Sequence, residues 1–267
     1  MRIAVVGHVE WVELARVERV PAPGEIVHAL EAWELPGGGG AVAAAQLARL
    51  AGDCLFLTAL GDDELGHRAK RELEALGVRV EPAWRSEPQR RAFVHVDANG
   101  ERTITVIGKR MGPRASDELP WSELEGADGV YFTAGDPGAL RQARRARVLV
   151  ATARELATIQ TAGVELDALV ASGHDDSERY QAGDLDPPPK LVVSTAGALG
   201  GWAQPGGPYK AASPTIPYED TYGAGDCFAA GLTFALAQGL EGPEALAFAS
   251  ERGALALGRR GAGLTPA

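Results

Sequence analysis

The sequence is poor in cysteine, and its two cysteines, Cys54 and Cys227, are too few for a disulfide framework. Both stand in apolar segments, so we expect buried, reduced thiols. The chain also lacks a surplus of positive charge. Its formal net charge of -10 gives no basic surface of the kind that nucleic-acid-binding proteins use to neutralise phosphates. A nucleic-acid partner is therefore not expected.

Long apolar runs are missing too. No segment approaches the length of a membrane span, and the N-terminus lacks the basic region and cleavage site of a signal peptide. We therefore expect a cytoplasmic protein without a membrane partner. Hydrophobic residues make up 45% of the 267 residues and charged residues 23%, which is an ordinary globular balance. No linker interrupts the chain, and residues 1–267 are interpreted as one domain.

Several ligand-binding motifs are also absent. Without a GxxxxGK[ST] phosphate loop, a nucleotide must be held in another way. The five histidines, among them His8, show no spacing such as HxxxH, which argues against a structural metal and favours solvent-facing or strand histidines. A relaxed dinucleotide pattern at Gly38, Gly40 and Ala43 follows a predicted lid strand instead of the first core strand. A nicotinamide-dependent dehydrogenase is therefore a remote alternative.

The chain does contain short apolar runs that alternate with helical patterns. Near-continuous apolar strands separated by helices predict an α/β fold, with a doubly wound, mostly parallel sheet and helices on both faces. The predicted strands begin at Ile3, Cys54, Val130, Val148, Leu166 and Leu191. The predicted helices span residues 40–51, 64–76, 137–146, 153–162, 225–238 and 243–257.

Two stretches, about 11–35 and 91–107, break this rhythm because polar and apolar residues alternate within them. They predict further strands at residues 11–20, 25–35, 92–97 and 102–107. The last two are joined through Asn99-Gly100, a strong hairpin signal because both residue types tolerate positive φ. A small sheet inserted here would lie near the carboxyl edge of the main sheet, where α/β proteins bind ligands. We expect a lid, with an antiparallel extension of the main sheet as the alternative.

The most informative segment is residues 220–226, DTYGAGD, which precedes an apolar helical pattern. Gly223, Ala224 and Gly225 should lie at a helix N-terminus, where unpaired N–H groups and the helix dipole attract phosphate. Phosphoryl transfer also needs a carboxylate that accepts the proton of the attacking hydroxyl, and Asp226 fits that role. Asp220 either sets the loop or binds a cation. The structural alternative is a helix cap and a tight turn without a ligand.

The string DTYGAGD, its late position and the apolar helix after it resemble the signature of the ribokinase-like, PfkB-type carbohydrate kinase family. Five further segments are similar to segments of that family, in the family's order. They are Pro36–Ala41, Leu60–Gly66, Asp97–Thr103, Thr195–Gly200 and Arg260–Ala262. The resemblance therefore extends over nearly the whole chain.

The resemblance implies transfer of the ATP γ-phosphoryl group to a hydroxyl of a small sugar or polyol, with Mg²⁺ bridging the phosphates and a monovalent cation as a further candidate. It also implies a homodimer that assembles through the lid. Residues implied in nucleotide binding are Asp220, Thr221, Thr195, Gly197 and Gly200. Residues implied at the sugar are Glu10, Gly38, Gly39, Gly40 and Val42.

The sequence departs from the family pattern at the sugar. Val42 stands where the family usually has Asn, and Glu10-Trp11-Val12 replaces an expected Asp. The family's Asn-x-x-Glu element, linked to magnesium, falls on residues 172–175, which makes Asp175 a candidate for holding a metal-bound water. A nucleoside kinase of the same fold, compatible with Val42 and Trp11, and a catalytically weak sugar or nucleotide sensor remain alternatives. Arg102 and Arg154 are interpreted as solvated surface pairs.

Overall fold

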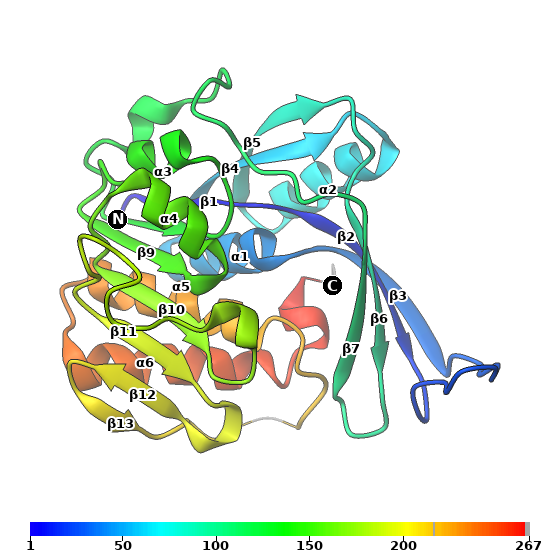
Figure 1. The fold of residues 1–267 in the computed structure, drawn as a ribbon. Helices are drawn as coiled ribbons and strands as arrows, with labels where there is room; N and C mark the ends of the chain where they lie inside the picture. Colours follow the sequence, from blue (N-terminus) through cyan, green and yellow to red (C-terminus); the bar gives the residue numbers. More distant parts are fainter. Residues whose placement is uncertain (216, 265–267) are drawn as a thin grey trace.

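The computed structural model of the chain describes residues 1–215 and 217–264 (Figure 1). Within these residues, nine strands form a large sheet in the order β13-β12-β11-β10-β9-β8-β1-β4-β5. Neighbours from β11 to β5 pair in parallel, and β12 and β13 add an antiparallel edge. The strands are β1 (Ile3–Val6), β4 (Cys54–Gly61), β5 (Val78–Arg85), β8 (Gly129–Phe132), β9 (Val148–Thr152), β10 (Ala168–Ser172), β11 (Val192–Thr195), β12 (Gly201–Gln204) and β13 (Gly207–Tyr209).

Helices cover both faces of this sheet, which confirms the predicted doubly wound fold. Side chains of β1 alternate between the faces: Ile3 and Val5 belong to a core with α1, α2, α5 and α6, and Ala4 and Val6 to a core with α3 and α4. Both cysteines are buried and free, as predicted. The helices are α1 (Gly39–Ala51), α2 (Glu64–Ala75), α3 (Pro137–Ala143), α4 (Leu156–Ala162), α5 (Ala224–Ala237) and α6 (Gly242–Ala256).

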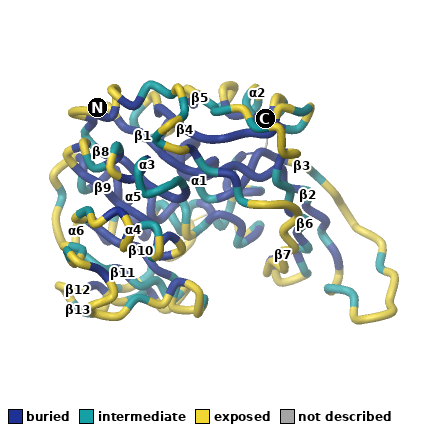
Figure 2. The backbone as a smooth tube through the Cα atoms, turned by 45° about the horizontal axis from the view of Figure 1, so that its top comes forward, coloured by how far each residue is buried: buried dark blue, intermediate teal, exposed yellow. Residues whose placement is uncertain are grey.

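The alternating stretches form a separate sheet, which we call the lid, in the order β3-β2-β6-β7 within the described residues. It does not extend the main sheet. β2 starts shortly after β1 ends, so the lid projects from the carboxyl edge of the large sheet, as Figure 1 shows. Figure 2 shows that β2 is largely buried whereas β7 is exposed. The strands are β2 (Glu10–Arg16), β3 (Glu31–Gly37), β6 (Arg91–Val96) and β7 (Arg102–Ile107).

Two predicted lid strands were too long. β2 ends at Arg16 and β3 begins at Glu31, and these two residues form the last pair of their ladder. The predicted strand positions 17–20 and 25–30 instead belong to the connection between them, where Pro21, Pro23 and Gly24, with φ = 87°, interrupt strand pairing.

The described part of the chain contains no helix that is both long and apolar enough to cross a membrane.

Candidate active site

Helix α5 carries the predicted anion hole at its N-terminus. Gly223, the residue before the helix, has φ = 72°, a left-handed conformation that glycine adopts without strain. A Cβ there would lie 2.9 Å from both Ala262 Cβ and Val42 Cγ1, so a side chain does not fit. At Gly225, in contrast, a Cβ would meet no atom within 4 Å. The first turn of α5, where N–H groups lack acceptors within the helix, is therefore open at Gly225.

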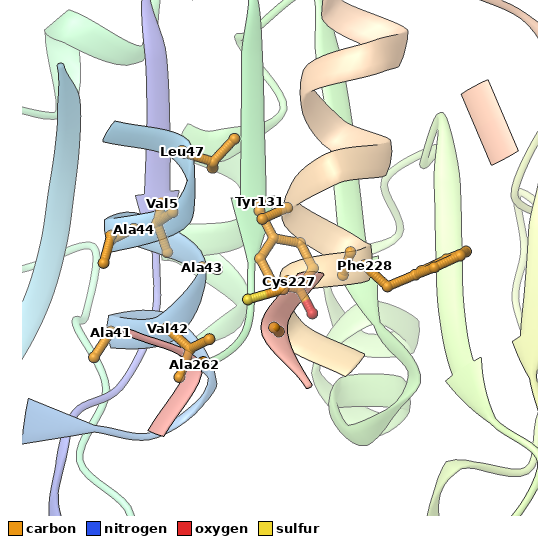
Figure 3. Close-up of a cluster of buried hydrophobic side chains, with 14 of the residues drawn as sticks. Val5, Ala41, Val42, Ala43, Ala44, Leu47, Tyr131, Cys227, Phe228 and Ala262 are labelled. Atoms are coloured by element: carbon orange, nitrogen blue, oxygen red, sulfur yellow. The ribbon is translucent and has the colours of Figure 1, made fainter. Parts of the chain in front are cut away.

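Val42, a predicted substrate contact, lies in the hydrophobic core instead. It is 2% exposed, and Figure 3 shows its side chain on α1 beside Ala262. Because its methyl groups pack behind Gly223, Val42 supports the loop before α5 and presents no open surface to a ligand. The prediction of a direct sugar contact at this position is corrected.

Asp220 shapes the same loop. It is 0% exposed, and its carboxylate accepts hydrogen bonds from Tyr222 N at 2.8 Å and Gly261 N at 3.0 Å. Tyr222 in turn accepts a hydrogen bond from Gly38 N at 2.9 Å through its hydroxyl. Of the two roles considered for Asp220, setting the loop or binding a cation, these bonds fit the first, because they fix the DTYGAGD loop against the C-terminal turn.

Thr221 links this loop to the lid. Its carbonyl accepts a hydrogen bond from Arg102 Nη1 at 2.8 Å, and its hydroxyl donates to Gly100 O at 3.4 Å. Arg102 therefore connects β7 to the start of α5 instead of forming a solvated surface ion pair. Hydrogen bonds therefore hold the lid hairpin against the loop that precedes α5.

Asp226 lies in the first turn of α5 and faces the glycine-rich start of α1. Its Oδ1 would be 2.8 Å from a Cβ at Gly39, so the absence of a side chain there leaves the carboxylate accessible. Loss of solvation raises the pKa of Asp226 to about 6, although the positive charges of Arg154 and Arg102 oppose this shift. A carboxylate with such a pKa accepts protons readily near neutral pH.

This raised pKa has a cost in stability. The folded state disfavours the Asp226 carboxylate, so the stabilisation that accompanies its protonation is complete below the ordinary pKa near 4 and is lost as the pH rises through 6. A shift of about 2 pKa units is worth at most about 3 kcal/mol, so at about 2–4 °C per kcal/mol we expect Asp226→Asn to raise Tm at pH 8 by at most about 6–12 °C. Thermal unfolding at pH 8 and pH 4 checks this, because the gain should shrink at pH 4. An equal Tm at pH 8 would contradict the raised pKa.

His8 follows β1 and is buried, contrary to the prediction of a solvent-facing or strand histidine. Its backbone lies against Gly40, where a Cβ would approach His8 O to 2.6 Å, and its Cε1 would be 3.7 Å from a Cβ at Gly39. Its Nε2 is 3.8 Å from Glu10 Oε1. The predicted sugar-site residues Glu10, Gly38, Gly39 and Gly40 are thus brought together, with His8 added to them. Together with Asp226, they surround one position at the carboxyl end of β1.

The predicted nucleotide residues Thr195, Gly197 and Gly200 lie at the carboxyl end of β11. Gly200 has φ = 92°, and a Cβ there would lie 2.0 Å from Tyr209 O, so only glycine allows this close approach. Thr195 donates a hydrogen bond to Ala171 O at 3.3 Å, which ties the loop to the neighbouring strand β10. These three residues are held together, as the sequence implied, but several strands away from His8.

The segment after β10 holds Asp175 in an ion-pair network. Arg154 contacts Asp175 Oδ2 and Glu178 Oε1, each at 2.7 Å, and Glu178 also accepts a hydrogen bond from Ser172 N at 2.8 Å. Within the described residues, no group of three or more His, Cys, Asp or Glu side chains could hold a metal ion. Asp175 is thus a partner of Arg154 and the cap of a short 3₁₀ turn at residues 176–178.

Three residues beside the candidate site were missed by sequence reasoning: Arg90, which pairs with Glu10 at 2.9 Å, Arg110, which donates to His8 Nδ1 at 3.3 Å, and Glu178. Arg90 immediately precedes β6, and Arg110 follows β7, so basic residues at the ends of lid strands were the available signal. Glu178 is buried and acts electrostatically on Asp226, yet it stands among exposed polar residues that resemble an ordinary loop. None of the three belongs to a short motif.

The model of the "pfkB family carbohydrate kinase" family matches residues 1–182 and, in an overlapping second segment, 165–267. The chain belongs to the pfkB family of carbohydrate kinases. It is therefore a phosphotransferase with an alcohol group as acceptor. A relative from Halopiger xanaduensis, an ATP-dependent ribose-1-phosphate kinase, is 32% identical, and the alignment covers 100% of this chain and 95% of that protein. The aminoimidazole riboside kinase of Salmonella typhimurium is 27% identical over 76% of this chain and 74% of that protein.

Solved structures show the same ribokinase fold for this pfkB kinase. The ribokinase of Thermotoga maritima aligns with a TM-score of 0.76 and 22% identity, over 100% of this chain and 96% of that chain. The adenosine kinase of Sinorhizobium meliloti aligns with a TM-score of 0.76 and 19% identity, over 97% of this chain and 94% of that chain.

Proposed function

We propose that this pfkB kinase transfers the γ-phosphoryl group of ATP to a hydroxyl of a ribose-type sugar, with Asp226 as the general base. The observation that carries the proposal is the placement of Asp226 in the first turn of α5, facing Gly39, with a pKa raised to about 6. The acceptor hydroxyl attacks the γ-phosphorus while its proton passes to Asp226, and ADP leaves. The N–H groups around Gly225 stabilise the charge on the transferred group.

The proposed nucleotide site extends from α5 to the loop after β11. Thr195, Gly197 and Gly200 border the nucleotide there, while its terminal phosphates reach Gly225. Mg²⁺ is proposed to arrive with ATP and to keep most of its water shell. Two carboxylates that follow β10, Asp175 and Glu178, are both paired with Arg154, which suits contacts to a hydrated ion better than direct ligation. The Asp220 carboxylate accepts hydrogen bonds from two backbone N–H groups, and this arrangement gives no support to a monovalent-cation site at Asp220.

A ribose ring is the proposed acceptor because it is the element common to the names of the relatives: ribose-1-phosphate kinase, aminoimidazole riboside kinase and ribokinase. The nucleoside alternative rested on Trp11 and Val42 as apolar contacts for a base. Both are buried in this structure, at 0% and 2% exposed, and leave no surface for a base. As an ATP-dependent enzyme, the kinase is proposed to work in the cytoplasm.

A coupled assay of ADP release tests the proposed function. ATP and Mg²⁺ are supplied with ribose, ribose phosphates, hexoses, polyols and nucleosides, each at several concentrations. Turnover with ribose-type acceptors above the background hydrolysis of ATP is expected. Turnover confined to hexoses or nucleosides would contradict the acceptor class, and ATP binding without turnover on any alcohol would favour the sensor alternative.

A homodimer through the lid stays a prediction, and the shape of one lid face supports it. On the lid face formed by Glu13, Ala15, Ala32, Glu34 and Phe93, a hollow of about 330 Å³ opens to solvent. We propose that a second copy of the chain packs against this face, because it would cover the exposed Ala32 and the half-buried Phe93.

We expect a dimer in sedimentation at micromolar concentration, and we expect Ala32→Glu to make it monomeric by placing a charge in that interface. Val17 is a poor site for such a test because it is 2% exposed within its own chain. Ile104, paired with Val94, lies on the opposite face of the lid and is 43% exposed, so Ile104→Glu is the matched control. A monomeric wild type, or a dimer unaffected by Ala32→Glu, would exclude this interface.

A further inference from the structure

Arg102, the first residue of β7, lies against the loop that leads into the proposed anion hole. β7 forms one edge of the lid, and Figure 1 shows this edge turned toward the main body. Arg102 Nη1 donates to Thr221 O at 2.8 Å, and the same oxygen accepts a hydrogen bond from Ala224 N, in the first turn of α5, at 3.5 Å. The guanidinium group and the N–H groups at the start of the helix are therefore neighbours around one oxygen atom.

Further contacts fix the backbone of the lid beside this loop. Gly100 O accepts hydrogen bonds from Thr221 N at 3.2 Å and from the Thr221 hydroxyl at 3.4 Å. Gly100 has φ = 77°, and a Cβ there would lie 2.3 Å from the ring of Tyr218, so the hairpin packs closely against the loop. Arg102 follows Gly100 by two residues. Its position is therefore set before a ligand arrives, which is the condition for an efficient electrostatic contact in catalysis.

The positive charge of Arg102 is not compensated by an ion pair. In the part of the chain that the structure describes, no carboxylate pairs with Arg102, and its Nε and Nη2 atoms donate no hydrogen bond, although the residue is exposed. The charges of Arg154 and Arg102 both oppose the raised pKa of Asp226, so both act at the proposed general base. Arg154, however, is paired with Asp175 and Glu178. Of these two arginines, Arg102 is the one that keeps its donors and its charge for a ligand.

Arg102 lies on the face of the lid that is turned toward the main body. Its partner in the β6–β7 ladder is Val96, which is fully buried, and side chains directly opposite each other in a ladder share a face. Arg91, on the same strand as Val96 but on the other side of the pleat, lies on the outer face and pairs with Glu13 at 2.7 Å. The lid therefore directs one arginine toward the anion hole and another away from it.

We infer that Arg102 is a further catalytic residue, whose Nε and Nη2 atoms donate to oxygens of the γ-phosphoryl group during its transfer. This inference rests on the proposed function. The acceptor hydroxyl oxygen bonds to the γ-phosphorus, the bond to the ADP oxygen breaks, and the hydroxyl proton goes to Asp226. Charge is then spread over the three remaining oxygens of the transferred group, which the N–H groups of α5 meet from the main body and the planar fork of Arg102 meets from the lid. Arg102 stays protonated throughout.

The kinetic test compares Arg102→Gln with Arg91→Gln, which removes the same charge from the outer face of the lid. We expect Arg102→Gln to lose about a hundredfold or more in kcat/KM for ATP, because a donor to the transition-state charge is removed. KM for the acceptor should change little, and Tm should stay near that of the wild type because the side chain is exposed. Arg91→Gln should resemble the wild type. Wild-type kinetics in Arg102→Gln, or an equal loss in both variants, would overturn the inference.

Arg102→Lys separates a contact to the phosphoryl group from a role in holding the lid. A lysine keeps the positive charge and can donate to Thr221 O, but its single ammonium group offers no planar fork to the phosphoryl oxygens. We expect Arg102→Lys to recover at most about a tenth of the wild-type kcat/KM for ATP. Full recovery would show that Arg102 acts only on the lid, and it would overturn the inference.

Calorimetry separates this inference from the proposed function, because it needs neither acceptor nor turnover. ADP and β,γ-imido-ATP, a non-hydrolysable analogue that carries a γ-phosphoryl group, are titrated with Mg²⁺ into the wild type, Arg102→Gln and Arg91→Gln. We expect Arg102→Gln alone to bind the analogue at least about tenfold more weakly while its affinity for ADP is unchanged. That result supports the contact even if no alcohol is phosphorylated. Equal losses on both ligands, or no loss on either, contradict it even if the enzyme is an active kinase.

Discussion

Asp226→Asn is expected to reduce kcat by about a hundredfold or more while ATP affinity stays near that of the wild type. Asn keeps the size of the side chain and its place in the first turn of α5, but it cannot accept the hydroxyl proton. ATP binding should persist because the nucleotide relies on the N–H groups of the helix and the loop after β11. Removing a negative charge beside the phosphates should, if anything, favour ATP.

The measurement pairs steady-state ADP release with calorimetric titration of ATP. Glu244→Gln is a suitable control, because Glu244 is an exposed carboxylate in the first turn of another helix, α6. It reports what the loss of a negative charge at a helix N-terminus does on its own. An unchanged kcat in Asp226→Asn would remove this residue from the mechanism. A matching loss of ATP affinity would make it a binding residue.

Gly225→Val is expected to lower kcat/KM for ATP by about a hundredfold or more without unfolding the protein. A Cβ at Gly225 meets no protein atom within 4 Å, so valine fits the free enzyme. Its methyl groups would then occupy the space in front of the first turn, where the γ-phosphate is proposed to bind. The cause is crowding of the ligand, because the positive φ of this loop belongs to Gly223 and not to Gly225.

Gly223→Val provides the contrast. Its side chain would meet Ala262 and Val42 in a left-handed backbone conformation, so we expect a lower Tm and loss of activity together. Thermal unfolding and ATP titration of both variants separate the two effects. Normal ATP kinetics in folded Gly225→Val would show that the loop does not hold phosphate.

The candidate site was predicted where local signals or family motifs mark it. The helical pattern after DTYGAGD indicated that loop, and the family resemblance indicated the glycines before α1 and the loop at Thr195–Gly200. Glycine marks them because close approach or positive φ excludes other residues, as at Gly223 and Gly200. Local signals of this kind also located the main helices and most parallel strands.

The contact between Arg110 and His8 could not be predicted from local signals. His8 and Arg110 are 102 residues apart in the chain and meet only because β7 returns from the lid to the carboxyl end of β1. A single arginine after a strand has many solvated counterparts in any sequence, and nothing in its neighbours indicates burial. The same limit applies to Val42, which the family pattern placed at the sugar, although the helix turns its side chain into the core near Ala262.

The ends of the lid strands were misjudged for a related reason. Residues 25–30 continue the alternation of polar and apolar side chains, but Ile26 and Leu30 are exposed, at 89% and 65%. Strand pairing there would need a partner beyond Arg16, where the chain turns away through Pro21 and Pro23. The alternation of polar and apolar residues is therefore compatible with a strand. It does not show whether a partner strand is present to pair with it.

Transfer of a labelled phosphoryl group tests the central claim most directly. The enzyme is mixed with ATP labelled at the γ-phosphorus and with ribose 1-phosphate or ribose, and the products are separated. Our account predicts that the label appears in a new sugar phosphate ester in step with ADP, and that Asp226→Asn suppresses both. Label found only in inorganic phosphate, or no transfer to either acceptor despite bound ATP, would contradict it.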